Sequence, residues 1–298
     1  MLEISEHRLG SRAVHTLKDE ATERRMRNAC NRAAAELGVN PVGSARSGVR
    51  SIGSLVETDD GKAWLRVCGA REGRGKGRLW TGNVDASRLL PLSIPRPSLL
   101  RWYDFAGDGY EYRAELFAYL PLETCTDGGH FLTGELDVSD EWWTTLRAAL
   151  TELAAVDVET DRHAVGQEYL NREMAARLGR PEMPTRVQRW TLAHGDLHFG
   201  NITRQGPVLL DWETWGLAPA GHDAASLVTY AVQAPDTCAR AREELTELLD
   251  GPEGRFAELA VITETLHIIE NGYHAEAELP LRERAWDLLE ICEREDWQ

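Results

Sequence analysis

The chain has 298 residues, with 33 Lys and Arg against 49 Asp and Glu, a formal net charge of −16. Its 42% hydrophobic and 28% charged residues are typical of a globular protein, and its length fits one large domain or two smaller ones. Because nucleic-acid binders hold phosphates with positively charged surfaces, the negative balance argues against a nucleic-acid partner and is compatible with a cationic ligand.

The cysteines and the first residues indicate a cytoplasmic protein. The five cysteines are scattered without a CxxC pair, and isolated thiols in odd number favour a reducing compartment over a disulfide framework. The first residues, MLEISEH, carry acids where a signal peptide has a basic flank and an apolar run. No stretch approaches about 18 uncharged apolar residues, so we expect no membrane span or membrane partner.

The first part of the chain, residues 1–121, predicts a small β-rich lobe with one or two helices. Helix formers over residues 20–37 are followed by Gly38, a common C-terminal helix stop. The Asp-Asp-Gly run at 59–61 lies between two apolar runs and predicts a hairpin. Residues 110–120 alternate between polar and apolar side chains as a strand does.

After residue 121, patterns of helical spacing dominate. Ser139 is an N-cap candidate for a helix over residues 140–156, and a second helix is predicted over 162–178. Further helices are predicted near residues 222–233, 236–250, 254–275 and 281–294. We therefore expect an α+β protein with an N-terminal lobe over residues 1–121 and a larger, mainly helical lobe over residues 122–298.

One segment places polar side chains between two short apolar runs: LAHGDLHFGNI at residues 192–202 and VLLDWE at 208–213. Asp196 and Asn201 are five positions apart, and Asp211 follows ten positions later. A strand, a loop and a second strand would bring these side chains together. Two carboxylates and an amide oxygen are hard ligands of the kind that Mg²⁺ accepts beside phosphates, and a carboxylate facing a hydroxyl can accept its proton.

HGDLHFGN followed by LLDWE resembles the catalytic loop and metal-binding motif of the aminoglycoside phosphotransferase family. That family consists of small-molecule kinases with a protein-kinase-like fold. The resemblance implies Mg²⁺-dependent transfer of the γ-phosphate of ATP or GTP to a hydroxyl group. It implies that Asp196 is the catalytic base, that Asn201 and Asp211 bind Mg²⁺, and that His194 braces the loop. Asp223 matches the family's aspartate that stabilises the region after the metal site.

The histidines of this segment allow an alternative. His194, Asp196 and His198 form a His-x-Asp-x-His pattern that would suit a dinuclear metal hydrolase. Further ligands would then come from His222, His267 and His274. This alternative leaves Asn201 and the LLDWE run unexplained. In the kinase interpretation His198 either braces the loop or takes part in catalysis directly.

The residues that would bind the nucleotide phosphates match the family's pattern less closely. The family uses a lysine on the third strand to hold the nucleotide phosphates, and here Arg66 occupies that position. Lys62 and Lys76 are fallback candidates. No helix with a glutamate is evident after this strand, and Asp85 is the candidate acid for pairing with Arg66.

Two further segments are predicted to contact the nucleotide. The glycine-rich stretch at residues 43–48 offers backbone N–H groups to phosphates, with Gly43 and Ser47 as the candidate residues. An ordinary turn is the simpler alternative for this stretch. By the resemblance, the hinge at residues 119–122 would meet the purine with its backbone, at Leu120 and Leu122.

The residues that would contact the acceptor are predicted only from their positions in the sequence. Glu213 and Trp215 directly follow the metal motif, and Glu270 lies in a C-terminal helical stretch that also contains Glu264. The acids of this stretch could line a cationic pocket, although a solvated helix face is the simpler interpretation. The tryptophan pair at 142–143 is expected to pack in the core.

The composition is rich in arginine, alanine and glycine and poor in lysine, as in GC-rich bacteria. In such hosts, members of the family often inactivate antibiotics. The resemblance therefore implies a small-molecule hydroxyl acceptor, with a cationic antibiotic first among the candidates and a monomer or homodimer as the assembly. Two alternatives stay open: a metabolic kinase for a sugar, amino alcohol or homoserine-type acceptor, and a degenerate member that binds ligand without catalysis.

Overall fold

The computed structural model describes the chain at residues 20–48, 51–75, 77–127 and 129–295. By its internal contacts the described chain divides into two compact units. The sheet unit comprises residues 20–89 and 96–121, and the helical unit comprises residues 90–95 and 122–295. No helix in the described ranges is both long enough and apolar enough to cross a membrane.

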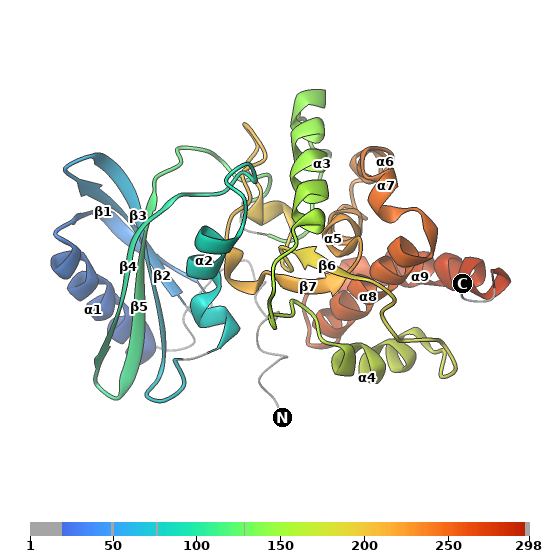
Figure 1. Ribbon diagram of the computed structural model, residues 1–298, viewed down its shortest axis with the longest axis horizontal. Coiled ribbons are helices and arrows are strands. Elements are labelled where there is room, and N and C mark those ends of the chain that lie inside the picture. The colour runs from blue at the N-terminus through green and yellow to red at the C-terminus, as the bar shows by residue number, and fades with distance from the viewer. Residues whose placement is uncertain (1–19, 49–50, 76, 128, 296–298) are drawn as a thin grey trace. The chain divides into compact units, whose positions relative to one another are not determined.

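The sheet unit is built on five antiparallel strands in the order β1-β2-β3-β5-β4 (Figure 1). Their bounds are β1 Asn40–Ser47, β2 Ser51–Thr58, β3 Gly61–Arg71, β4 Leu99–Gly107 and β5 Tyr110–Ala118. The hairpin predicted at residues 59–61 is confirmed, because it joins β2 to β3 with Thr58 paired to Gly61. The strand predicted over residues 110–120 corresponds to β5.

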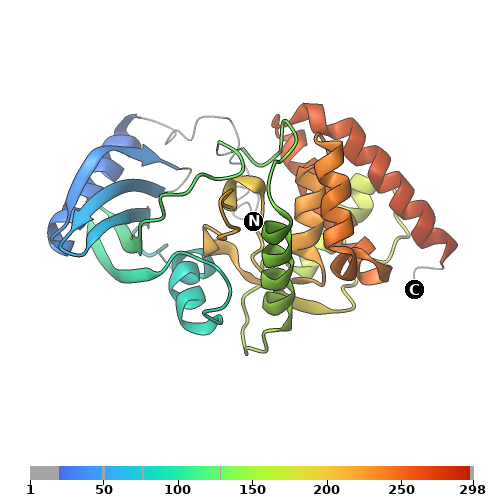
Figure 2. The ribbon, with the colours of Figure 1, turned by 90° about the horizontal axis from the view of Figure 1, so that it is seen from above.

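The helix predicted over residues 20–37 is confirmed as α1, Glu20–Leu37. Its buried side chains recur at helical spacing and include Met26, Cys30 and Ala33. They share one apolar core with residues of β2, β3 and β5, such as Leu65. Both ribbon views accordingly show α1 (blue) lying along the sheet (Figures 1 and 2). A second helix, α2 Arg78–Leu89, agrees with the one or two helices expected in this lobe, although its position was not predicted.

The helical unit contains most of the remaining elements. They are α3 Asp140–Ala155, α4 Gln167–Leu178, β6 Trp190–Ala193, β7 Gly216–Pro219, α5 His222–Tyr230, α6 Pro235–Glu244, α7 Thr246–Leu249, α8 Gly251–Glu270 and α9 Glu278–Arg294, with short 3-10 turns at Phe199–Asn201, Trp212–Thr214 and Ala275–Ala277. The predicted cap of α3 is confirmed, because the Ser139 hydroxyl accepts a hydrogen bond from the Trp142 N–H.

The prediction of a helix over residues 162–178 was wrong at its start. Backbone bonds join Arg162 and Ala164 to Leu217 of β7, which holds residues 162–164 extended. Helix α4 begins only after Gly166. Long-range pairing with β7 therefore overrides the local helical spacing.

Helix α8 lies at the centre of the helical unit and contacts α4, α5 and α9. Most of its side chains are buried, as expected of a helix covered on several faces. Two of the buried residues are acids, Glu258 and Glu264, each only 3% exposed. Each therefore needs a partner inside the protein.

Candidate active site

The candidate catalytic loop follows β6, which pairs antiparallel with β7. The run predicted as a second strand at 208–211 forms only one bridge, between Ile202 and Leu209. Beside this bridge the Leu210 N–H donates to the Asn201 carbonyl oxygen over 2.8 Å. This pairing brings Asp211 next to Asn201, although the two residues are ten positions apart.

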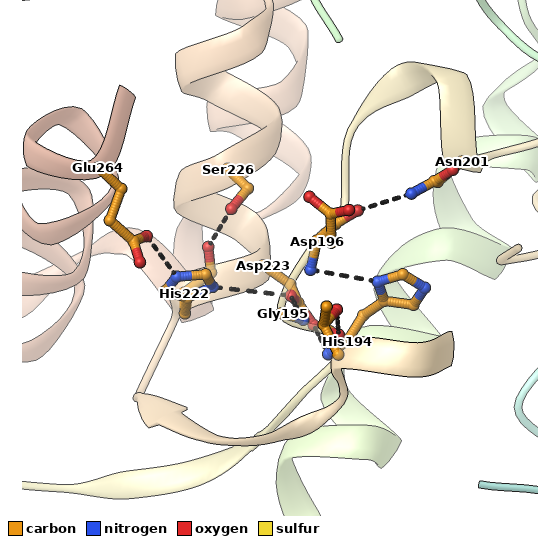
Figure 3. Close-up of polar contacts among 9 residues, drawn as sticks. His194, Gly195, Asp196, Asn201, His222, Asp223, Ser226 and Glu264 are labelled. Carbon is orange, nitrogen blue, oxygen red and sulfur yellow. Dashed lines mark hydrogen bonds and ion pairs between the residues drawn. The ribbon is translucent and has the colours of Figure 1, made fainter. Parts of the chain in front are cut away.

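A side-chain bond joins Asn201 to the residue predicted as the base. The Asn201 Nδ2 donates to the backbone carbonyl oxygen of Asp196 over 2.9 Å (Figure 3). The bond fixes which way the amide faces, since only its nitrogen can donate, and leaves Oδ1 as the acceptor atom. Asp196 itself is half-buried. The structure thus brings Asp196, Asn201 and Asp211 into one region of the helical unit.

Asp211 has an unusual backbone conformation. Its φ of 60° and ψ of 63° lie in the left-handed region, which a residue other than glycine adopts at a cost of about 1–2 kcal/mol. Such strain is common where a side chain must be aimed at a ligand. The Asp211 carboxylate and the Asn201 amide oxygen are hard donors, so this pair fits Mg²⁺ chemically.

His194 is held inside the loop by both ring nitrogens. Its Nε2 donates to the Leu210 carbonyl oxygen over 2.8 Å, and its Nδ1 accepts from the Asp196 N–H over 3.4 Å. Burial lowers the pKa of His194, against the opposing effects of Asp223 and Asp196. A neutral ring with both nitrogens bonded to the protein does not serve as a metal ligand. This arrangement argues against the dinuclear metal hydrolase.

Asp223 holds the backbone of the same loop. Its carboxylate accepts the N–H of His194 over 2.7 Å and the N–H of Gly195 over 3.1 Å (Figure 3). Burial alone would raise the pKa of Asp223, but His222, His194 and the backbone donor outweigh burial and lower it. The resemblance implies that Asp223 stabilises the region after the metal site, and the structure shows its carboxylate bonded to the backbone of the candidate catalytic loop.

His198 is buried, and its ring forms a local cap. Its Nδ1 accepts the Gly200 N–H over 3.1 Å at the start of the 3-10 turn. The ring centroids of His198 and His130 are 4.0 Å apart. Of the two roles that the sequence left open, this geometry favours bracing of the loop. The sequence offered no signal for His130, which comes from a distant segment.

In the sheet unit, the structure gives Arg66 a partner that sequence reasoning missed. Arg66 Nη1 lies 2.9 Å from Glu115 Oε2, and the two residues face each other across β3 and β5. Asn83 of α2 donates to the same carboxylate oxygen over 2.9 Å. Asp85, the acid expected from the sequence to pair with Arg66, lies on α2. The available signal was the position of Glu115 between Ala114 and Leu116 within the strand predicted over residues 110–120.

The other residues that were predicted to contact the nucleotide lie on strand β1 and in the connection that follows β5. Gly43 has a φ of 74° at a register shift of β1, and Ser47 ends that strand. The Ser47 hydroxyl is buried and has no hydrogen-bond partner among the described residues. Leu120 and Leu122 lie in the irregular connection after β5. Lys62 is exposed next to the β2–β3 turn, and Lys76 lies outside the described residues.

With this geometry established, the chain can be compared with known proteins. A sequence model described as the phosphotransferase enzyme family matches residues 80–259, well over half of the chain. The chain belongs to this family. No curated protein matches it.

Two solved structures share the fold of this phosphotransferase. The aminoglycoside phosphotransferase APH(4)-Ia has a TM-score of 0.55 and 12% identity, over 87% of this chain and 98% of that chain. The spectinomycin phosphotransferase APH(9)-Ia, solved with ADP and spectinomycin, has a TM-score of 0.51 and 11% identity, over 84% of this chain and 92% of that chain. The predicted α+β, kinase-like fold is therefore confirmed.

The residues predicted on the acceptor side of the phosphotransferase are less favourably placed. Trp215 is fully buried at 0% exposure, so it has no face for an acceptor, and that prediction is withdrawn. Glu270 forms an ion pair with Arg177 over 3.0 Å. Glu213 is half-buried, and its carbonyl oxygen accepts from Arg162. The solvated face expected for most of the C-terminal acids does not include Glu264, which is buried.

Proposed function

We propose that this phosphotransferase transfers the γ-phosphate of ATP or GTP, with Mg²⁺, directly to a hydroxyl of a small molecule, and that this molecule is an antibiotic. The observation that carries the proposal is the link of Asn201 to Asp196 through its amide, and to the segment that carries Asp211 through the Leu210 N–H, beside backbone N–H groups held by Asp223. A base, two hard metal donors and a rigid loop are the parts that phosphoryl transfer requires.

In the proposed reaction the acceptor oxygen forms a bond to the γ-phosphorus as the bond from that phosphorus to the β–γ bridging oxygen breaks. The proton of the acceptor hydroxyl passes to the Asp196 carboxylate. Asn201 and Asp211 would hold Mg²⁺, which when bound offsets the negative charge of the phosphates. Arg66 would bind phosphate oxygens, since a guanidinium donates bidentately, and Glu115 would fix its position.

The protein contributes mainly by positioning. His194 and Asp223 hold the backbone on both sides of Gly195, so the Asp196 carboxylate is held in a fixed direction before the acceptor arrives. The nitrogens of His194 are already bonded to the protein, which leaves no role for that ring as a phosphorylated intermediate. Direct transfer is the simpler route.

The choice of an antibiotic as acceptor has two supports. The names of both similar structures describe phosphotransferases of antibiotics, aminoglycoside in one and spectinomycin in the other. The net charge of −16 also favours a cationic acceptor over an anionic one.

An acceptor screen tests the proposal. The protein is mixed with Mg²⁺ and ATP or GTP and with two pools, one of antibiotics and one of sugars, amino alcohols and amino-acid alcohols. Mass spectrometry should detect a gain of about 80 Da, the mass of one HPO₃, in an antibiotic. Omission of Mg²⁺ is the control and should abolish the gain.

Each other outcome of the screen contradicts part of the proposal. A gain confined to the second pool would identify a metabolic kinase. No gain in either pool, together with no Mg²⁺-dependent thermal shift by nucleotide, would identify a protein that binds without catalysis.

A further inference from the structure

Asp223 is linked to a second buried acid, Glu264, through His222, the residue that precedes Asp223 in the chain. His222 Nδ1 lies 3.8 Å from Asp223 Oδ1, and His222 Nε2 lies 3.1 Å from Glu264 Oε2 on α8 (Figure 3). The His222 side chain has no exposed surface, and that of Glu264 is 4% exposed. A continuous polar path therefore runs from α8 through α5 to the catalytic loop.

Packing alone does not require these ionisable groups. Helices α5 and α8 contact each other and bury mainly apolar side chains. Removing a carboxylate from water costs several kcal/mol unless partners compensate, so an apolar pair would serve packing equally well or better. Clusters of buried ionisable groups are concentrated at functional sites, and this cluster ends on the candidate base loop.

The geometry indicates how the ring joins its two acids. The Glu264 carboxylate can only accept a hydrogen bond, so the proton of that bond lies on His222 Nε2. The Nδ1 atom faces the second carboxylate, that of Asp223. Its separation of 3.8 Å from Oδ1 of Asp223 is a close approach and not a hydrogen bond. The bond to Glu264 fixes the orientation of the His222 ring, and the fixed ring lies against the Asp223 carboxylate.

We propose that His222 and Glu264 are positioning residues for phosphoryl transfer. By holding Asp223 as a carboxylate in the correct orientation, they keep its two bonds to the N–H groups of His194 and Gly195 and so set the direction of Asp196. This inference rests on the proposed function, because its kinetic consequence is a change in transfer rate.

The variant Glu264→Gln tests the inference. It keeps the size of the side chain and removes its charge. We expect kcat to fall about tenfold or more while the KM for nucleotide stays within about twofold, because the residue acts on the base loop and not on nucleotide binding. The side chain introduced by His222→Gln cannot carry a charge, so this variant should also lower kcat with little change in the KM for nucleotide. It replaces Glu264→Gln in the test if that variant does not fold.

Glu258→Gln is the matched control. Glu258 lies on the same helix and is equally buried, but its partners are Arg242 and Arg284 of α6 and α9. The control should lower the Tm and leave kcat within about twofold of the parent. Equal losses of kcat in Glu258→Gln and Glu264→Gln would overturn the inference, since stability alone would then explain both.

A second readout needs no acceptor. NMR measures hydrogen exchange of the Gly195 and His194 amides, whose N–H groups Asp223 accepts. Exchange should be about tenfold faster or more in Glu264→Gln and unchanged in Glu258→Gln. Unchanged exchange, or a kcat within twofold of the parent in the folded variants, would overturn the inference. A parent protein that transfers no phosphate would contradict the proposed function, and exchange would still decide this inference.

Discussion

Gly195 has a left-handed backbone conformation within the candidate catalytic loop. Its φ of 79° favours glycine, and an added Cβ would lie 2.4 Å from the Ala164 Cβ. The same residue donates its N–H to Asp223, so the conformation cannot change without loss of that bond. The loop motif therefore requires glycine here for reasons of both space and backbone angle.

We predict that Gly195→Ala lowers the free energy of unfolding by about 2–4 kcal/mol, because left-handed strain and a close contact add together. Urea unfolding measures the change. Gly206→Ala is the control, since a Cβ there would meet nothing within 4 Å, and its free energy should change by less than about 0.5 kcal/mol. Equal changes in the two variants would contradict this account of the loop.

His194 gives the protein a predictable response to acid. Burial holds its pKa below the ordinary 6.5. As the pH falls through about 6.5, the unfolded chain takes up a proton on this ring and the folded chain does not. Protons then favour unfolding, so the free energy of unfolding should decrease towards pH 5 by up to about 1.4 kcal/mol per pH unit.

His267 and His274 should also decrease the free energy of unfolding as the pH falls, because burial lowers the pKa of each. The comparison of parent with His194→Gln isolates the contribution of His194. Urea unfolding at several pH values between 5 and 7 should give a shallower slope for the variant. Identical slopes would show that His194 is not buried in the neutral form.

How far the sequence predicts the site depends on the range of each interaction. Asp196, Asn201 and Asp211 lie within one short motif, so their spacing was sufficient to propose a shared site. Glu115 and Glu264 join residues far away along the chain, at Arg66 and His222. No local pattern distinguishes such buried acids from solvated ones, because their burial is decided by tertiary packing.

At the scale of elements, those with strong local signals were predicted well. Helix α1 has helix formers ending at Gly38, and α3 has a serine cap followed by acids. Helix α2 has a glycine in its interior, no acid in its first turn and no alternation to mark it, so it was missed. Strand β4 was missed as well, and it is an edge strand with mainly exposed or half-buried side chains.

The Glu115 carboxylate links three elements of the sheet unit, β3 through Arg66, β5 through its own backbone and α2 through Asn83. We predict that Glu115→Gln raises the KM for nucleotide about tenfold with a smaller effect on kcat, because Arg66 loses the charge that orients it. Steady-state kinetics measures both constants.

Lys62→Ala is the control for that prediction, because Lys62 is exposed beside a turn. Its KM for nucleotide should match that of the parent. A raised KM in Lys62→Ala with an unchanged KM in Glu115→Gln would move the phosphate-binding cation from Arg66 to Lys62.

At the scale of the whole molecule, family and fold are established more firmly than the acceptor. The family match over residues 80–259 supports phosphotransfer, and the two similar structures share the fold. At identities of 12% and 11%, the similarity extends to the fold and not to the side chains that would select an acceptor. The charge of −16 has a specific consequence for the proposed reaction, in which Mg²⁺ and Arg66 would offset it where the anionic nucleotide would bind.

The central claim is that Asp196 is the base of phosphoryl transfer in this chain. The most direct measurement compares kcat of Asp196→Ala with that of the parent and determines the nucleotide Kd of both by calorimetry. We predict that kcat falls by about a thousandfold or more, within the range that general-base catalysis supplies, while the Kd stays within about threefold. Turnover of Asp196→Ala within tenfold of the parent would contradict the claim.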